Sequence, residues 1–189
     1  QNCIKLDQIH VMQASPKIPH PVLQQMKAEF DRITPNASFH LVPASPKDFT
    51  IDYRLTRPDN ERTKEAYGDS VDRKRFRIGE MYAFMHLARY LLNTTSVPYI
   101  GINQEDVMWN YPLLGLDKSL DKADVTSLYS RNRKVGKCIN VYCGFLSLIF
   151  RRETLEDFLK WVQPIWKEEP IAWLFEDYVQ DRNLTVRVD

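Results

Sequence analysis

The alternation of apolar and polar positions changes its period twice within the first forty residues. Residues 6–14 alternate and are rich in Ile, Val and Met, which predicts a strand. Residues 39–42 predict a second, shorter strand. Between them, residues 21–33 carry apolar side chains at helical spacing: Val22, Met26, Phe30 and Ile33. A strand, a helix and a strand in succession indicate a parallel pair with a crossover, so the pattern predicts the α/β class.

The middle of the chain begins with a segment of little periodicity, residues 43–72, which predicts a long irregular loop. A helical pattern returns over residues 76–92, where six apolar side chains line one side: Met81, Phe84, Met85, Leu87, Ala88 and Leu91. We expect this helix to pack on the sheet and to lead into a strand over residues 99–107. Residues 108–133 are mixed, and we expect loop with a short helix near residues 123–129.

The last third of the chain predicts two more strands and two more helices. Residues 139–150 form an apolar run interrupted by Gly144, which indicates a strand or a strand pair. Helices are expected over residues 154–162 and 170–179, and a final strand over residues 184–188. Three side chains of the second helix should be buried: Trp173, Leu174 and Tyr178.

Composition fits a packed globular protein, because 43% of the 189 residues are hydrophobic and 12% are aromatic. This length is most simply one domain, so residues 1–189 are expected to form a single α/β domain. Lys and Arg number 26 against 25 for Asp and Glu, and we therefore expect no nucleic acid as a partner. No apolar run approaches the ~18 residues of a membrane span. Because the chain begins with Gln and lacks a signal-peptide pattern, we expect a processed or excised piece, with membrane attachment only through a segment outside it.

Several chemistries are disfavoured by what the chain lacks. The six glycines form no phosphate-binding loop, which disfavours kinases, ATPases and nicotinamide enzymes. The four histidines include no pair at metal-ligand spacing, so a zinc centre is not expected. The three cysteines, Cys3, Cys138 and Cys143, leave two interpretations open: one disulfide with a spare thiol, or three buried thiols.

Three glycosylation sequons begin at Asn36, Asn93 and Asn183. Chance alone would give roughly one in a chain of this composition. We therefore expect the chain to lie in the secretory lumen and to be glycosylated at one or more of these residues. Asn93 is the best placed of the three, since it falls at the expected end of a helix.

Two adjacent carboxylates, Glu105 and Asp106, follow the strand that starts at Tyr99. Ligands of α/β sheets bind at the carboxyl ends of strands, where acids are well placed to hold a divalent metal. An ordinary polar turn after the strand explains the pair equally well. Arg75 and Arg77 precede the middle helix, where they fit either a phosphate site or a solvated helix start.

A second carboxylate pair, Glu176 and Asp177, lies on the last helix. A metal at the first pair would neutralise a leaving diphosphate, and a carboxylate of the second pair would take a proton from an acceptor hydroxyl. A solvated helix face is the alternative interpretation of Glu176 and Asp177.

The order of these segments resembles the N-acetylglucosaminyltransferase IV family. Residues 75–85, with Tyr82-Ala83-Phe84, and residues 99–107, with Gln104-Glu105-Asp106, are similar to a family block in which a Tyr-Ala-Phe helix precedes a strand ending in Glu-Asp-Asp. Residues 144–150 and 167–174 resemble a later block. The transferase that adds a side-chain sugar to glycosylphosphatidylinositol anchors shares this layout. The resemblance covers roughly residues 70–188.

The resemblance implies a GT-A-like (Rossmann-like) fold, a mostly parallel sheet flanked by helices. It also implies an inverting glycosyltransferase that moves a sugar, an N-acetylhexosamine, from a uridine diphosphate (UDP) sugar to a glycan or glycolipid acceptor. The resemblance further implies manganese as the metal cofactor, a location in the Golgi or endoplasmic reticulum lumen, and a membrane anchor ahead of the enzyme domain.

Mapped by residue, the resemblance puts the metal motif at Gln104, Glu105 and Asp106. Asp106 is the expected direct ligand, Glu105 assists the metal or the donor, and Gln104 replaces an acid of the family. Arg75 and Arg77 are expected to bind the donor diphosphate.

The base site departs further from the family pattern. Ala172 stands where the family has an Asp, so Glu176, which matches a second family acid, and Asp177 remain as candidates for the catalytic base. The chain also stops at Asp189, before a His-Val-Gly segment that such enzymes usually carry. A transferase-fold protein without catalysis, which binds or regulates glycosylation enzymes, is the alternative function.

Overall fold

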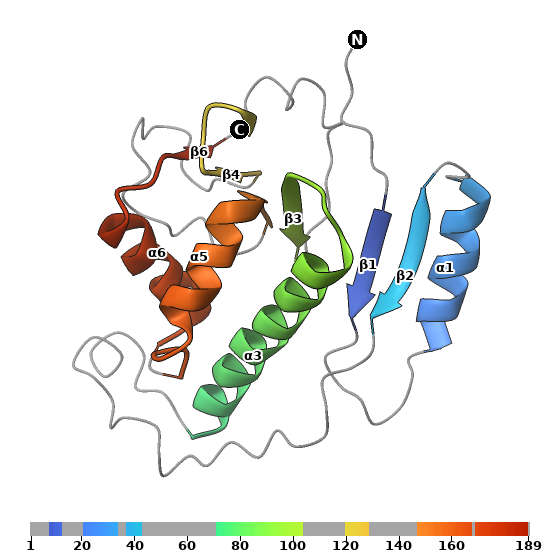
Figure 1. Ribbon diagram of the computed structural model, residues 1–189. Helices are drawn as coiled ribbons and strands as arrows, with labels where there is room; N and C mark the ends of the chain where they lie inside the picture. Colours follow the sequence, from blue (N-terminus) through green and yellow to red (C-terminus); the bar gives the residue numbers. More distant parts are fainter. Residues whose placement is uncertain are drawn as a thin grey trace. The chain divides into compact units, whose positions relative to one another are not determined.

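The computed structural model describes seven segments of the chain (Figure 1), residues 8–12, 21–33, 37–42, 71–103, 120–128, 147–167 and 169–188. For residues 71–75 and 188 it describes the backbone alone. The chain divides into two compact units, Lys5–Ile51 and a larger one made of Gln1–Ile4 with Asp52–Asp189. The expectation of one domain over residues 1–189 stays a prediction, and each unit is described by itself.

The described residues of the smaller unit form a strand, a helix and a strand: β1 (Gln8–Met12), α1 (Pro21–Ile33) and β2 (Ser38–Val42). The two strands are parallel, in a register that pairs Gln8 with Ser38 and Met12 with Val42. This confirms the parallel pair and the crossover helix that the periodicity predicts. The sequence also predicts the bounds of α1 to the residue.

The apolar side of α1 contacts its sheet through one aromatic pair. The Phe30 ring lies 5.5 Å from the ring of Phe39, which is buried on β2. Three other apolar side chains at helical spacing are exposed: Val22, Met26 and Ile33. A two-stranded sheet is narrow, so it covers only part of the apolar surface that α1 presents.

In its described residues, the larger unit contains a four-stranded sheet and three helices. Its elements are α3 (Val71–Thr94), β3 (Tyr99–Asn103), β4 (Val125–Ser127), β5 (Ser147–Arg151), α5 (Arg152–Val162), α6 (Ile171–Asp181) and β6 (Val186–Val188). The strand order is β3-β5-β4-β6. Both units combine helices with sheets, so the α/β class is confirmed.

The four-stranded sheet is mixed and not mostly parallel. β5 is antiparallel to β3 and to β4, whereas β4 and β6 are parallel. Three strands therefore run in one direction and β5 runs against them. The apolar pattern of a strand carries no information on its direction, which is set by the partners it finds, here Phe150 opposite Ile100 and Val125.

One face of this sheet packs against all three helices. Side chains of the strands and the helices form a single core whose centre is a group of aromatic rings: Phe84, Phe150, Phe158, Phe175 and Tyr178. Phe158 lies 5.6 Å from Phe175 and 5.0 Å from Tyr178, measured between ring centroids. Each such side chain stabilises the fold by about 1.5–3 kcal/mol through its removal from water. The predicted core side of α3 is confirmed, with Met81 and Ala88 fully buried.

One expected element is of the wrong type. The helix expected near residues 123–129 is the strand β4, whose three residues Val125, Thr126 and Ser127 are all buried. β4 lies between β5 and β6, so both of its edges are hydrogen-bonded to neighbouring strands, and β-branched side chains suit that position. A buried run of three residues has no room to show the alternation by which a strand is recognised.

The other differences concern element bounds. β3 ends at Asn103, and the remainder of the expected 99–107 strand lies outside the described residues, as do residues 139–146. α5 begins at Arg152, two residues earlier than expected. On α6, Leu174 and Tyr178 are buried as predicted, but Trp173 is half-buried. In the part of the chain that the structure describes, no helix combines the length and the apolar character that crossing a bilayer requires.

Arg152 connects the end of α3 to the start of α5. Its guanidinium donates hydrogen bonds to the carbonyl of Leu92 and, at 2.8 Å, to that of Thr95, while its backbone N–H donates to the Pro98 carbonyl at 2.8 Å. The last carbonyls of a helix have no partner within the helix and favour a cation. The ion pair with Glu156, at 3.3 Å, orients the guanidinium.

We expect Arg152→Met to lower the free energy of unfolding by about 2–3 kcal/mol, because two charge-assisted hydrogen bonds are lost together. Arg152→Lys keeps the charge but lacks the forked donor geometry, so it should recover only part of this loss. Urea unfolding measures both. Arg89→Met is the matched control, since exposed Arg89 on α3 donates a hydrogen bond to the Gln163 side chain and to no other described residue, and its change should stay within about 0.5 kcal/mol. Equal losses for the two Met variants would contradict the assigned role of Arg152.

Candidate functional site

The carboxyl ends of three strands meet at one edge of the larger sheet. β3, β4 and β6 run in the same direction, so Asn103, Ser127 and Val188 end there, beside Ser147, where β5 begins. Ser127 and Ser147 are both buried, and Asn103 is exposed. In open α/β sheets this is the edge at which ligands bind.

The predicted metal motif follows this edge directly in the sequence. β3 ends at Asn103, and Gln104, Glu105 and Asp106 are the next three residues, which lie beyond the described part of the chain. The strand exit on which the prediction depends is therefore observed, whereas the three side chains themselves stay a prediction. Among the described residues, no three His, Cys, Asp or Glu side chains are grouped so that they could hold a metal ion.

An aromatic contact joins α3 to the turn after α5. Tyr82 on α3 and Trp166, in the turn after α5, have ring centroids 6.0 Å apart. The Nζ atom of Lys167 lies over the Trp166 ring, 5.1 Å from its centroid. Contact between an aromatic ring and a cation at this distance is favourable. The Tyr-Ala-Phe helix and the segment that begins at Lys167 thus form one surface.

The predicted basic residues lie in the first half of α3. Arg77 is half-buried, and for Arg75 the structure gives the backbone alone. α3 packs against both α5 and α6, so the helix that carries Arg77 neighbours the helix that carries the second carboxylate pair. The structure brings these elements together.

Both predicted acids of α6 lie off its core-facing side. The buried residues of the helix are Ile171, Leu174, Phe175 and Tyr178. Glu176 follows Ala172 by four residues and lies on the same side of α6, whereas Asp177 is rotated by about 100° from Glu176. Both acids are half-buried, which differs from the fully exposed carboxylates that a solvated helix face predicts.

Tyr178 fixes the orientation of α6 beside these acids. Its hydroxyl shares its one proton between the Asp157 carboxylate, at 3.0 Å, and the Thr154 carbonyl, at 3.2 Å, and Arg182 donates to the same carboxylate at 3.0 Å. Burial, together with the bond to Asp157, raises the pKa of the Tyr178 phenol above its ordinary value of 10.0. These bonds join the buried side of α6 to α5, two residues after Glu176 in the sequence.

The three sequon asparagines differ in their surroundings. Asn36 lies outside the described segments. Asn93 is exposed in the last turn of α3, and Asn183 is exposed in the turn after α6 with a φ of 50°, a left-handed conformation that Asn tolerates. Both described sequons are accessible.

The structure also pairs two histidines whose spacing gives no such signal. His10 on β1 and His40 on β2 are register partners, and their rings stack with centroids 4.7 Å apart. Burial lowers the pKa of His10, and the nearby charge of His40 lowers it further. Thirty residues separate the two, so only the strand register, and no local motif, could have revealed the pair.

Comparison with known proteins adds no relative. No protein-family model, no curated protein and no solved structure matches this chain.

We expect Tyr178→Phe to lower the free energy of unfolding at neutral pH by about 1–2 kcal/mol, because Asp157 loses a buried donor. Urea unfolding measures the change. Tyr99→Phe is the matched control, since its hydroxyl bonds Asp121 in an exposed position, and we expect a change within about 0.5 kcal/mol.

The raised pKa of Tyr178 also sets the sign of a pH effect. Since the folded state holds this proton more tightly than the unfolded state, the stabilisation is complete below pH 10.0 and is lost as the pH rises above that value. As the pH rises above 10.0, the free energy of unfolding should therefore fall further for the wild type than for Tyr178→Phe. If the free energy of unfolding fell equally with pH in the two proteins, the assigned hydrogen bond of the buried hydroxyl would be contradicted.

Proposed function

We propose that the chain is an inverting glycosyltransferase that moves an N-acetylhexosamine from a UDP-sugar to a glycan or glycolipid acceptor in the Golgi or endoplasmic reticulum lumen. The observation that carries the proposal is the end of β3 at Asn103, at the carboxyl edge of a helix-covered α/β sheet and directly before Gln104-Glu105-Asp106. The contact between Tyr82 and Trp166 supports it, since it places the Tyr-Ala-Phe helix beside the turn that leads into residues 167–174, a segment that resembles the N-acetylglucosaminyltransferase IV family. A GT-A-like arrangement is part of the proposal.

The donor chemistry of Glu105 and Asp106 fits manganese. Carboxylate oxygens suit hard divalent ions, and the exposed amide of Asn103 at the strand end adds a further oxygen nearby. Asp106 would hold the ion and Glu105 would assist it. When bound, such an ion neutralises the charge of the leaving diphosphate. Neither thiolates nor paired imidazoles occur in the motif, so zinc fits less well.

The basic residues of α3 would hold the rest of the donor. Arg77 is half-buried on a helix that packs against α6, and Arg75 precedes it by two residues on the same helix. Guanidinium groups bind phosphate oxygens with two parallel hydrogen bonds. Gln104 would contact the donor through its amide, which can bind sugar hydroxyls but brings no negative charge to the metal.

The carboxylate of Glu176 is the proposed base. The acceptor oxygen bonds to the anomeric carbon of the sugar while the bond from that carbon to the diphosphate breaks, and Glu176 takes the hydroxyl proton. Attack from the side opposite the diphosphate inverts the anomeric centre. Glu176 is favoured over Asp177 because it shares the side of α6 on which Ala172 lies.

A second function is favoured by two departures from the family pattern. Gln104 removes one acid from the metal motif, and Ala172 removes a carboxylate from the base site. A chain with these changes can bind the donor or an acceptor without transferring the sugar. Such a protein would bind or regulate glycosylation enzymes.

We expect calorimetry to show UDP-sugar binding that requires manganese and that zinc supports less well. Asp106→Ala should abolish the metal dependence, because the direct ligand is lost. Glu153→Ala is the matched control, since Glu153 is an exposed carboxylate at the start of α5, and it should bind like the wild type. If Asp106→Ala bound the UDP-sugar with an unchanged dependence on manganese, the assignment of Asp106 as the metal ligand would be wrong.

We expect Glu176→Gln to reduce sugar transfer by about 10²–10⁴-fold with little change in donor affinity, because only proton removal is affected. Asp177→Asn should retain most activity. The reverse result would exchange the two roles, and full activity in both variants would place the base elsewhere. If the wild-type chain binds a UDP-sugar but transfers nothing to any acceptor, the non-catalytic function takes its place.

A further inference from the structure

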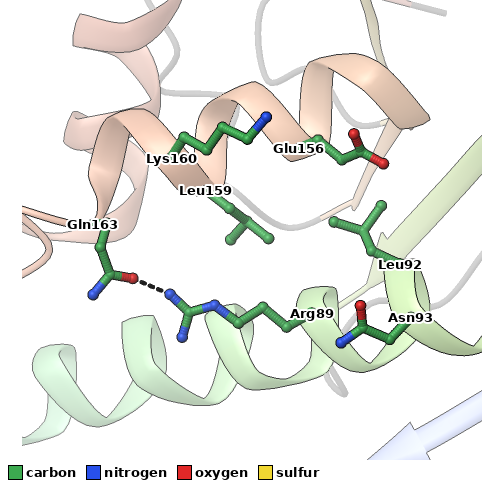
Figure 2. Close-up of a pocket in the computed structure, with 7 residues that line it drawn as sticks. All are labelled: Arg89, Leu92, Asn93, Glu156, Leu159, Lys160 and Gln163. Carbon is green, nitrogen blue, oxygen red and sulfur yellow. Dashed lines mark hydrogen bonds between the residues drawn. The ribbon is translucent and has the colours of Figure 1, made fainter.

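A shallow groove of about 340 Å³ runs between α3 and α5. Figure 2 shows residues of α3 facing residues of α5 across it. α3 contributes Arg89, Leu92 and Asn93, and α5 contributes Glu156, Leu159 and Lys160. The side chain of Asn93, a sequon asparagine, therefore forms part of the wall of the groove.

The groove has an apolar floor and a polar rim. Leu159 is buried and Leu92 is half-buried, while Lys160 is exposed on the rim. At one end the Arg89 guanidinium donates a hydrogen bond to the Gln163 side chain, which Figure 2 marks with a dashed line. The surface thus offers an apolar patch with hydrogen-bonding groups around it.

We propose that this groove holds the innermost N-acetylglucosamine of a glycan attached to Asn93. The proposal rests on the secretory location that belongs to the proposed function. The bond forms between Nδ2 of Asn93 and the anomeric carbon of a sugar carried on a lipid diphosphate; the amide loses a proton and the diphosphate leaves. The attached sugar then starts at the wall of the groove, since Asn93 lines it.

The chemistry of this sugar matches the groove. One face of the ring and the acetamide methyl are apolar and suit Leu92 and Leu159, whereas the hydroxyls suit Glu156 and Lys160. The sugar is neutral, and the Glu156 carboxylate is already paired with Arg152 at 3.3 Å. The carboxylate therefore does not require a cationic occupant.

Covalent attachment explains how so shallow a site could be filled. A free ligand would lose translational and rotational freedom on binding, which an open groove with few contacts repays poorly. A sugar tethered to Asn93 is already at a high effective concentration, so weak contacts suffice. An occupant attached to the wall is favoured over a diffusing one.

The sequon hydroxyl indicates when the glycan is added. In the folded chain Thr95 donates its hydroxyl to the Leu91 carbonyl at 2.8 Å, and Thr94 donates to the Tyr90 carbonyl at 2.7 Å. These bonds belong to the finished last turn of α3. The modification therefore precedes completion of the helix, and the groove closes around a sugar that is already present.

The experiment uses the full chain secreted from animal cells, with site occupancy read by mass spectrometry. One sample is trimmed by an endoglycosidase that leaves a single N-acetylglucosamine, and another by an amidase that removes it and converts Asn to Asp. We expect the single sugar to preserve Tm and its removal to lower Tm by about 2–4 °C. Amide hydrogen exchange in residues 156–163 should become faster at the same step.

Two variants serve as controls. Asn93→Asp lacks the sugar and carries the charge that the amidase creates, whereas Asn93→Gln lacks both, so an equally lowered Tm in the two variants assigns the loss to the sugar and not to the charge. Asn93→Gln keeps the sequon at Asn183, in the turn after α6, and its Tm should not change when the remaining sugars are removed.

An unmodified Asn93 in the secreted chain would overturn the proposal, and so would an unchanged Tm and unchanged exchange after loss of the first sugar. Either failure is distinct from failure of the proposed enzyme function, because UDP-sugar binding is measured separately and does not depend on Asn93.

Discussion

The carbonyl groups at the end of α3 need donors that the helix cannot supply, and Arg152 provides them. Its side chain bonds the carbonyls of Leu92 and Thr95, and its backbone bonds that of Pro98, just before β3. One residue at the junction of β5 and α5 thus fixes where α3 ends and where β3 starts. The opposite end of β3, at Asn103, then falls at the carboxyl edge of the sheet, where the acidic motif begins. The position of the candidate site therefore depends on a contact at the far edge of the same sheet.

The sequence predicts elements that carry their own periodic signal. α1 has four apolar residues at helical spacing, and its bounds are correct even though most of these residues are exposed. The direction of β5 and the identity of β4 could not be predicted in this way. Thr126 is buried between two neighbouring strands, and what makes it part of a strand is the pair of partners on either side, Ile149 and Arg187. The local pattern of hydrophobic and polar residues carries no information on pairing between strands that are distant in the sequence.

In the candidate site, too, features with a local sequence signal could be predicted, whereas contacts between distant residues could not. That a strand would begin at Tyr99 could be predicted from the apolar residues that follow it, although the expected strand ran to residue 107 and β3 ends at Asn103. That Tyr82 would meet Trp166 could not, since 84 residues separate them and only the packing of α3 beside the turn after α5 brings the rings to 6.0 Å. The stacking of His10 on His40 likewise requires the strand register. The sequence predicts residues with suitable chemistry, whereas the fold decides which of them meet.

If the proposed function holds, the methyl group of Ala172 at the expected base position constrains which acceptor an active enzyme could use. A methyl group cannot take a proton, and the next acid on that side of α6, Glu176, lies about 6 Å further along the helix axis, at 1.5 Å per residue. Tyr178 and its bond to Asp157 prevent α6 from rotating to compensate. An acceptor hydroxyl within hydrogen-bond reach of Glu176 must therefore bind about one helical turn away from the position that a base at residue 172 would serve. Under the proposed mechanism, this chain either holds an acceptor of different shape from those of the family it resembles or performs no transfer.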